Sequence, residues 1–218
     1  EIVKIIYGLL IGLICFIIVL RVDKLFRLSL HQGIRYFRNA FFFYGLAFII
    51  RYIFGALVFY ESINGEYLPA ITLVFKYFLI MAGFFLIYSL LWRKLESSNR
   101  NYYSSLLNPK ITIFYIMALV IVFLDYFWQT HYFIFISQII LFVIAIGISY
   151  LNYSRGKSKH KFLKFYFAAM VIALAAWIFN AISALLEWNQ YILISSYLAN
   201  IIIFLLFLYG VINATRLK

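Results

Sequence analysis

Charged side chains are rare in the apolar stretches of this sequence, so the few that occur there are the first candidates for chemistry. Arg51 lies inside the run FFFYGLAFIIRYIFGALVFY, thirteen residues after Arg38 and ten before Glu61, its nearest charged neighbours. At about 1.5 Å of rise per helical residue, these spacings place Arg51 roughly 20 Å and 15 Å from the two helix ends. Because a charge in the middle of a membrane is expensive, Arg51 is a candidate functional residue.

Other polar side chains lie at a similar depth. They are Lys76, Asp125, Gln138, Asn180 and Asn200, and each falls in a different apolar segment. Counted from the segment ends on one expected side of the membrane, all six polar residues lie about 9–15 Å deep. Trp177 and Asn180 share a helical stripe with Ser183 and Glu187, at spacings of three and four residues. Six helices are therefore predicted to contribute polar groups to one layer.

The functional interpretation of this layer is a ligand pocket that opens to the outside, with Arg51 at its floor. The predicted ligand-binding residues are Arg51, Lys76, Asp125, Gln138, Trp177, Asn180 and Asn200. Two cations against one acid leave the layer positive, so the expected ligand is a small anion or an amphipathic molecule with an acidic group. Aromatic residues such as Tyr44 and Trp177 would form apolar walls, as is usual in ligand pockets.

The structural interpretation of the same residues needs no ligand. Arg51 and Asp125 would form a buried ion pair, and the asparagines would join helices through hydrogen bonds. Lys76 would extend its amine to the outer headgroups while its stem stays in the apolar layer.

Several kinds of catalytic or cofactor site have no candidate residues. The three histidines, His31, His131 and His160, all lie outside the middle of the apolar segments, so neither a bis-histidine haem nor a zinc site is predicted. No phosphate-binding glycine loop or nucleophile elbow occurs. We therefore assign no cofactor and no metal, and a membrane-embedded enzyme is the least favoured of the functional alternatives, because the sequence indicates no acid, base and nucleophile within reach of one another. A count of seven spanning helices, which the apolar segments described below predict, resembles that of opsins. The seventh apolar segment, residues 191–213, however has no lysine that could bind retinal.

The composition indicates the elements that must position these residues. The chain has 218 residues, of which 67% are hydrophobic and 12% are charged. Soluble domains are about 45–50% apolar and about 25% charged, so we predict a multi-pass integral protein of the cell membrane. Seven apolar segments are long enough to span, at residues 2–20, 39–60, 69–91, 111–129, 132–152, 162–186 and 191–213. Residues 1–218 are expected to form one all-α seven-helix domain. Gly8 and Gly12 form a GxxxG pair, which marks either a dimer face or close packing inside the bundle.

The basic residues predict the orientation. Sixteen of the nineteen lysines and arginines fall in or beside alternate loops and the C-terminal tail, all on one side of a seven-span arrangement. The positive-inside rule then places the N-terminus outside and the C-terminus in the cytoplasm. The net charge of +12 is explained by this topology and by anionic membrane lipids, so no nucleic acid is expected as a partner.

The leading functional hypothesis is a sensor or receptor-type module that takes part in signal transduction. Its output would lie after Lys218 or on a cytoplasmic partner bound to the basic loops. The first alternative is a small-solute transporter with three helices, a linker helix and three more helices, a parallel-repeat arrangement known from sugar transporters of the SWEET type. The second alternative is a non-catalytic membrane subunit of a larger complex.

Overall fold

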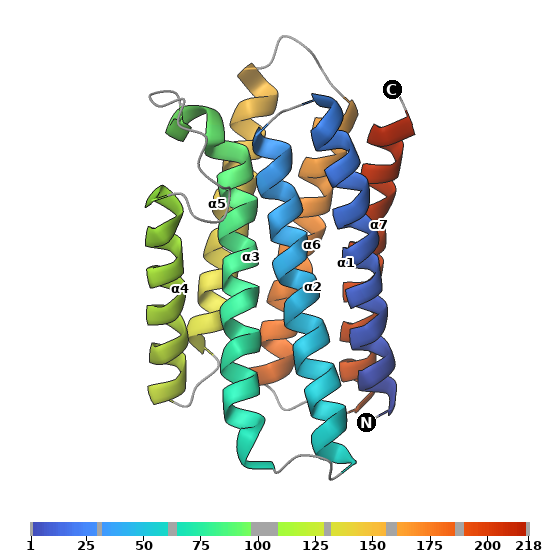
Figure 1. The fold of residues 1–218 in the computed structure, drawn as a ribbon, viewed down its shortest axis with the longest axis vertical. Helices are drawn as coiled ribbons and strands as arrows, with labels where there is room; N and C mark the ends of the chain where they lie inside the picture. Colours follow the sequence, from blue (N-terminus) through green and yellow to red (C-terminus); the bar gives the residue numbers. More distant parts are fainter. Residues whose placement is uncertain are drawn as a thin grey trace.

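The computed structural model describes residues 2–29, 32–60, 65–96, 109–128, 132–155, 161–185 and 190–216. Within these ranges the chain forms seven α-helices and one short 3-10 helix (Figure 1). They are α1 (Ile2–Ser29), α2 (Gln32–Phe59), η1 (Gly65–Tyr67), α3 (Leu68–Glu96), α4 (Pro109–Phe127), α5 (Tyr132–Arg155), α6 (Lys161–Leu185) and α7 (Gln190–Arg216). Each α-helix contains most of one predicted apolar segment, so the prediction of an all-helical chain is confirmed.

The helix ends follow local chemistry. Pro69 is the second residue of α3 and Pro109 is the first residue of α4. Both are in the first turn of their helix. Backbone N–H groups there have no acceptor within the helix, so a proline, which lacks the N–H, removes no helical hydrogen bond. The first loop is shorter than predicted, because α1 and α2 continue through most of the basic stretch 21–38. Asp23 supports these extensions, since its carboxylate pairs with Arg27 one turn later and with Arg38 on α2.

Six helices form a closed ring. In chain order α1, α2, α3, α5, α6 and α7 each pack against the next, and α7 packs back against α1. Helix α4 lies outside the ring and packs against α3 and α5 (Figure 1). Successive helices run in alternating directions, and the two termini lie at opposite ends of the bundle. We call the end with the C-terminus the basic end, because the last part of α1, with Arg21, Lys24 and Arg27, and the first part of α2, with Arg35 and Arg38, lie there.

The GxxxG pair serves packing between α1 and α2. A Cβ atom on Gly8 would lie 2.2 Å from the Tyr52 ring, and one on Gly12 would lie 2.7 Å from Ile49. The two glycines therefore let the helices approach closely, and Gly45 does the same opposite Cys15, where a Cβ would lie 3.1 Å from the cysteine Cβ.

The exterior of the bundle is apolar. Among the exposed side chains are Leu13 and Phe16 on α1 and Ile113, Val120 and Phe123 on α4. Five helical stretches among the described residues are long and apolar enough to cross a membrane, within α1, α2, η1–α3, α5 and α7. Soluble proteins rarely expose apolar surface on this scale, so the bundle is that of a membrane-embedded protein.

Candidate functional site

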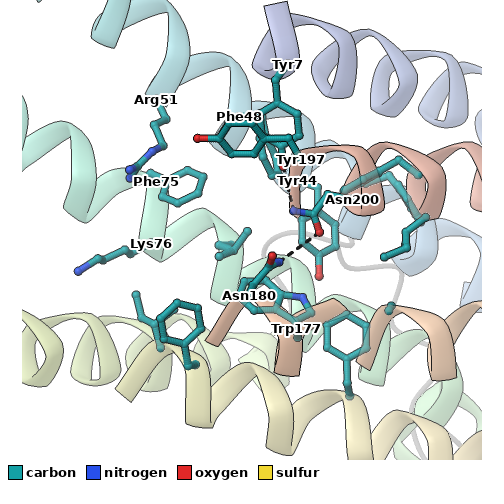
Figure 2. A pocket seen from close by; sticks show the side chains of 18 of the residues that line it. Tyr7, Tyr44, Phe48, Arg51, Phe75, Lys76, Trp177, Asn180, Tyr197 and Asn200 are labelled. Atoms are coloured by element: carbon teal, nitrogen blue, oxygen red, sulfur yellow. Dashed lines mark hydrogen bonds between the residues drawn. The ribbon is translucent and has the colours of Figure 1, made fainter. Parts of the chain in front are cut away.

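A cavity of about 330 Å³ lies inside the six-helix ring. Its lining residues come from all six ring helices, and α4 contributes none of them. Figure 2 shows that Arg51 and Lys76 lie toward one side of this cavity, and that Asn180 and Asn200 lie on the other. Of the seven residues predicted to bind a ligand, five line the cavity: Arg51, Lys76, Trp177, Asn180 and Asn200.

Arg51 contacts an aromatic ring. Its guanidinium carbon lies 4.6 Å from the centre of the Phe75 ring on α3, and Phe75 packs edge-on against Phe48 at 5.8 Å between ring centres. Among the described residues, no carboxylate lies within ion-pair distance of Arg51. A desolvated cation–π contact is worth about 2 kcal/mol. Since removing an ion from water costs several kcal/mol, the ring offsets only part of the cost of this charge.

The predicted ion pair between Arg51 and Asp125 is wrong. Asp125 instead accepts a hydrogen bond from the Lys76 amine, at 2.5 Å from Nζ to Oδ2. The other carboxylate oxygen, Oδ1, accepts from the backbone N–H of Ile134 at 3.4 Å. That N–H is in the first turn of α5, where backbone donors have no helical acceptor. Asp125 is 1% exposed and lies behind the cavity wall, where it joins α3, α4 and α5.

The same pair decides the role of Lys76. Its side chain lines the cavity but is directed to Asp125, so it does not extend to the headgroups as the structural interpretation expected. The pair is neutral as a whole. Arg51 is therefore the cavity cation whose charge is not balanced by an acid among the described residues.

A chain of hydrogen bonds crosses the other side of the cavity. The Ser196 hydroxyl donates to Asn180 Oδ1, and Asn180 Nδ2 donates to Asn200 Oδ1 at 3.2 Å. Asn200 Nδ2 then donates to the Tyr7 hydroxyl oxygen at 3.1 Å. The chain joins α6, α7 and α1, so both asparagines do hold helices together as the structural interpretation proposed. It also leaves the Tyr7 O–H as a donor, and Tyr7 is itself a lining residue.

Gln138 is placed outside the cavity. Its side chain is fully buried, and its Nε2 donates to the backbone carbonyl of Leu79 at 3.2 Å. It packs against Gly83, where a Cβ atom would lie 3.2 Å from the amide oxygen. Gln138 therefore joins α5 to α3. Its predicted depth in the membrane is the same as that of the cavity residues, but depth does not determine which side of the helix a side chain faces.

Sequence reasoning missed most of the aromatic lining. Tyr44 and Trp177 were expected as walls and do line the cavity, but Tyr7, Tyr52 and Tyr197 were not considered. Tyr7 stacks on the Tyr197 ring at 4.3 Å between centres and meets Tyr52 edge-on at 5.6 Å. A signal was present, because these tyrosines lie five to seven residues from the ends of their helices, close to the depth of Arg51, which lies eight residues from the end of α2.

Part of the predicted stripe on α6 cannot be placed. The side chain of Ser183 and the whole of Glu187 lie outside the described residues. Across the part of the chain that is described, no three His, Cys, Asp or Glu side chains lie close enough together to hold a metal ion.

Comparison with known proteins gives one match and no activity. No family model and no solved structure matches the chain. An uncharacterised protein of Archaeoglobus fulgidus is 29% identical over 182 residues, which cover 80% of this chain and 75% of that protein. The chain is similar to this archaeal protein over most of the length of both.

Proposed function

We propose that the chain is a seven-helix membrane sensor or receptor module that binds a small or amphipathic anion in the cavity of the six-helix ring. The observation that supports this most is Arg51. It is a cation in the wall of the cavity, it has no acidic partner within ion-pair distance among the described residues, and its guanidinium lies over the Phe75 ring. An anion beside the guanidinium would supply the missing counter-charge.

The neighbouring groups suit an anion as well. The Asn180 and Asn200 amides lie across the cavity from Arg51 (Figure 2), and Asn200 donates to the hydroxyl oxygen of Tyr7, which also lines the cavity. A charged group binds most tightly where hydrogen bonds to it are shielded from water. The aromatic walls supply this shielding.

The proposed topology has seven crossings, with the N-terminus outside and the C-terminus in the cytoplasm. Helices α4 and α6 have 19 and 25 residues. At 1.5 Å per residue they reach about 28 and 37 Å, against about 30 Å for the hydrocarbon core. The basic end would face the cytoplasm, in line with the positive-inside rule. Arg51 and Asn180 would then lie in the outer half of the membrane.

A route for signalling starts at Lys76. An anion beside Arg51 would also attract the Lys76 amine and so compete with Asp125 for it. Asp125 makes a polar link from α4 to both α3 and α5. Weakening it would free α4, the one described α-helix outside the ring, to shift. A ligand changes a conformational equilibrium only if it binds one conformation more tightly than the other. A contact between the anion and the Lys76 amine, made when Lys76 leaves Asp125, would provide this difference in affinity.

A second candidate function, transport, is favoured by the arrangement of the ring. Helices α1–α3 and α5–α7 form two consecutive triads with the same helix directions, and α4 connects them from outside. This is the order expected of a three-plus-one-plus-three transporter with parallel repeats, whose solute site lies between the triads. The cavity lies at that position.

The test compares purified protein with and without candidate anions. We expect millimolar acetate, phosphate or decanoate to raise the unfolding temperature of the wild type relative to chloride, because a ligand of the folded state stabilises it. The same anions should have no effect on Arg51→Met. No shift with any of the three would contradict the proposal. Uptake of the active anion into proteoliposomes would favour transport, and binding without uptake would favour sensing.

A further inference from the structure

We infer that the ligand is a single-chain anionic amphiphile, with its acidic head at Arg51 and its hydrocarbon chain directed toward the basic end of the bundle. The inference rests on the proposed function, because it assigns a ligand class to the same cavity. It is argued from the shape of the cavity and from the order of its lining residues along the helices.

The lining changes from polar to apolar along the bundle axis. On α2 it runs from Arg51 to Phe41, on α3 from Lys76 to Leu86, and on α7 from Asn200 to Phe207. Each of these steps goes from the polar layer toward the basic end. The cavity therefore has a charged end and a hydrocarbon end, which is the polarity of an amphiphile and not that of a small hydrophilic ion.

The dimensions suit one chain. Ten residues separate Arg51 from Phe41 and Lys76 from Leu86, which is about 15 Å along a helix. The volume of about 330 Å³ is roughly twice that of an apolar cavity of about 150 Å³ that binds one benzene, so about twelve non-hydrogen atoms fit, which is the size of decanoate.

A small inorganic anion would leave most of this space unfilled. Protein interiors are packed so closely that voids larger than a water are few, and an engineered apolar cavity of about 150 Å³ stays dry. Water is a poor occupant of the apolar end, whose lining includes Phe207, Ile203, Phe142 and Ala173. A hydrocarbon chain fills that end and an acidic head reaches Arg51, so one molecule accounts for both halves of the cavity.

The experiment measures the binding of a series of ligands to the full chain in nanodiscs, by titration calorimetry. The series is acetate, hexanoate, decanoate and hexadecanoate, with decanol as the uncharged analogue. We expect decanoate to bind most tightly, with acetate and decanol at least about tenfold weaker. Equal affinities for decanoate and decanol would contradict a head group at Arg51.

Two variants test the apolar end. Ala173→Phe fills it and should abolish decanoate binding while acetate still binds, whereas Ala175→Phe on the exposed side of the same helix should change neither. Phe207→Ala lengthens the cavity and should move the preferred chain length upward, which keeps the test valid if Ala173→Phe fails to fold. If acetate binds as tightly as decanoate and neither variant matters, the amphiphile is wrong but the anion site remains. If no carboxylate binds but phosphate does, the amphiphile is wrong and the anion site remains, and if neither binds, the proposed function fails as well.

Discussion

Lys76 on α3 and Asp125 on α4 form an ion pair at 2.5 Å between Nζ and Oδ2, in which the carboxylate side chain is completely buried. The pair has two consequences. It fixes α4 to the outside of the ring, together with the hydrogen bond from Ile134. Asp125 is also the one acid among the described membrane-embedded residues that could have neutralised Arg51. Because it pairs with Lys76, Arg51 remains as a cation in the cavity wall without an acidic partner among these residues.

Coupling between mutations should follow this pairing. Lys76→Met and Asp125→Leu should each lower the free energy of unfolding by about 3–5 kcal/mol, because each leaves a charge buried without its partner. The double variant should lose less than the sum, by more than about 1 kcal/mol. Arg51→Met combined with Asp125→Leu should instead be additive within about 0.5 kcal/mol. Unfolding of the purified variants in detergent measures both double-mutant cycles. Strong coupling between Arg51 and Asp125 would indicate that these two residues form an ion pair, and would contradict the pairing of Asp125 with Lys76.

Arg51→Met should stabilise the unliganded protein. The substitution replaces a poorly compensated charge with an apolar side chain of similar length, and replacing even a paired buried charge by apolar side chains is often neutral or stabilising. The expected result is an unfolding temperature at or above that of the wild type in the absence of added anion. Lys4→Met, at the same end of the bundle but outside the cavity lining, is the control. A large loss of stability in Arg51→Met alone would mean that the guanidinium is structural.

The α1–α2 contact should depend on Gly8. A Cβ atom there would lie 2.2 Å from the Tyr52 ring, so Gly8→Ala forces the helices apart and should cost about 1–3 kcal/mol, as overpacking does. Gly55 on α2 is the matched control, because a Cβ there meets nothing within 4 Å. Gly55→Ala should be neutral or stabilise by up to about 1 kcal/mol, since alanine is the better helix former. Equal effects of the two variants in thermal unfolding would argue against the close α1–α2 packing.

The proposed orientation is tested by cysteine accessibility. With the buried Cys15 replaced by alanine, Glu66→Cys should react with a membrane-impermeant thiol reagent on intact cells, and Lys24→Cys should react only after permeabilisation. Both positions are exposed, so access to the reagent and not burial decides the result. The opposite pattern would place the basic end outside and overturn the topology.

The helices could be predicted from the sequence because their signal is strong and local. A run of about twenty apolar residues has few alternatives to a helix, since a membrane cannot satisfy backbone polar groups in any other open structure. The extension of α1 and α2 through the basic stretch was not predicted. It depends on Asp23 meeting Arg38 from another helix, which is a tertiary contact.

The site could be predicted by depth but not by direction. Arg51, Asn180 and Asn200 share a level and also face the same cavity, whereas Gln138 shares the level and faces α3. Which cation meets Asp125 depends on ring order, and α4 touches α3 but does not pack against α2. Lys76 on α3 therefore reaches Asp125, and Arg51 on α2 does not. Neighbour relations of this kind are set by packing between helices, which no spacing within one segment reveals.

The most direct measurement for the anion site compares binding by the wild type, Arg51→Met and Lys4→Met in nanodiscs, with whichever of acetate and decanoate binds the wild type more tightly. We predict saturable binding of one anion per chain by the wild type. Arg51→Met should bind at least about tenfold more weakly, a loss of about 1.4 kcal/mol. Lys4→Met should change the affinity by less than about twofold, because a charge outside the cavity is screened. Unchanged affinity in Arg51→Met, or an equal loss in Lys4→Met, would contradict an anion bound at Arg51.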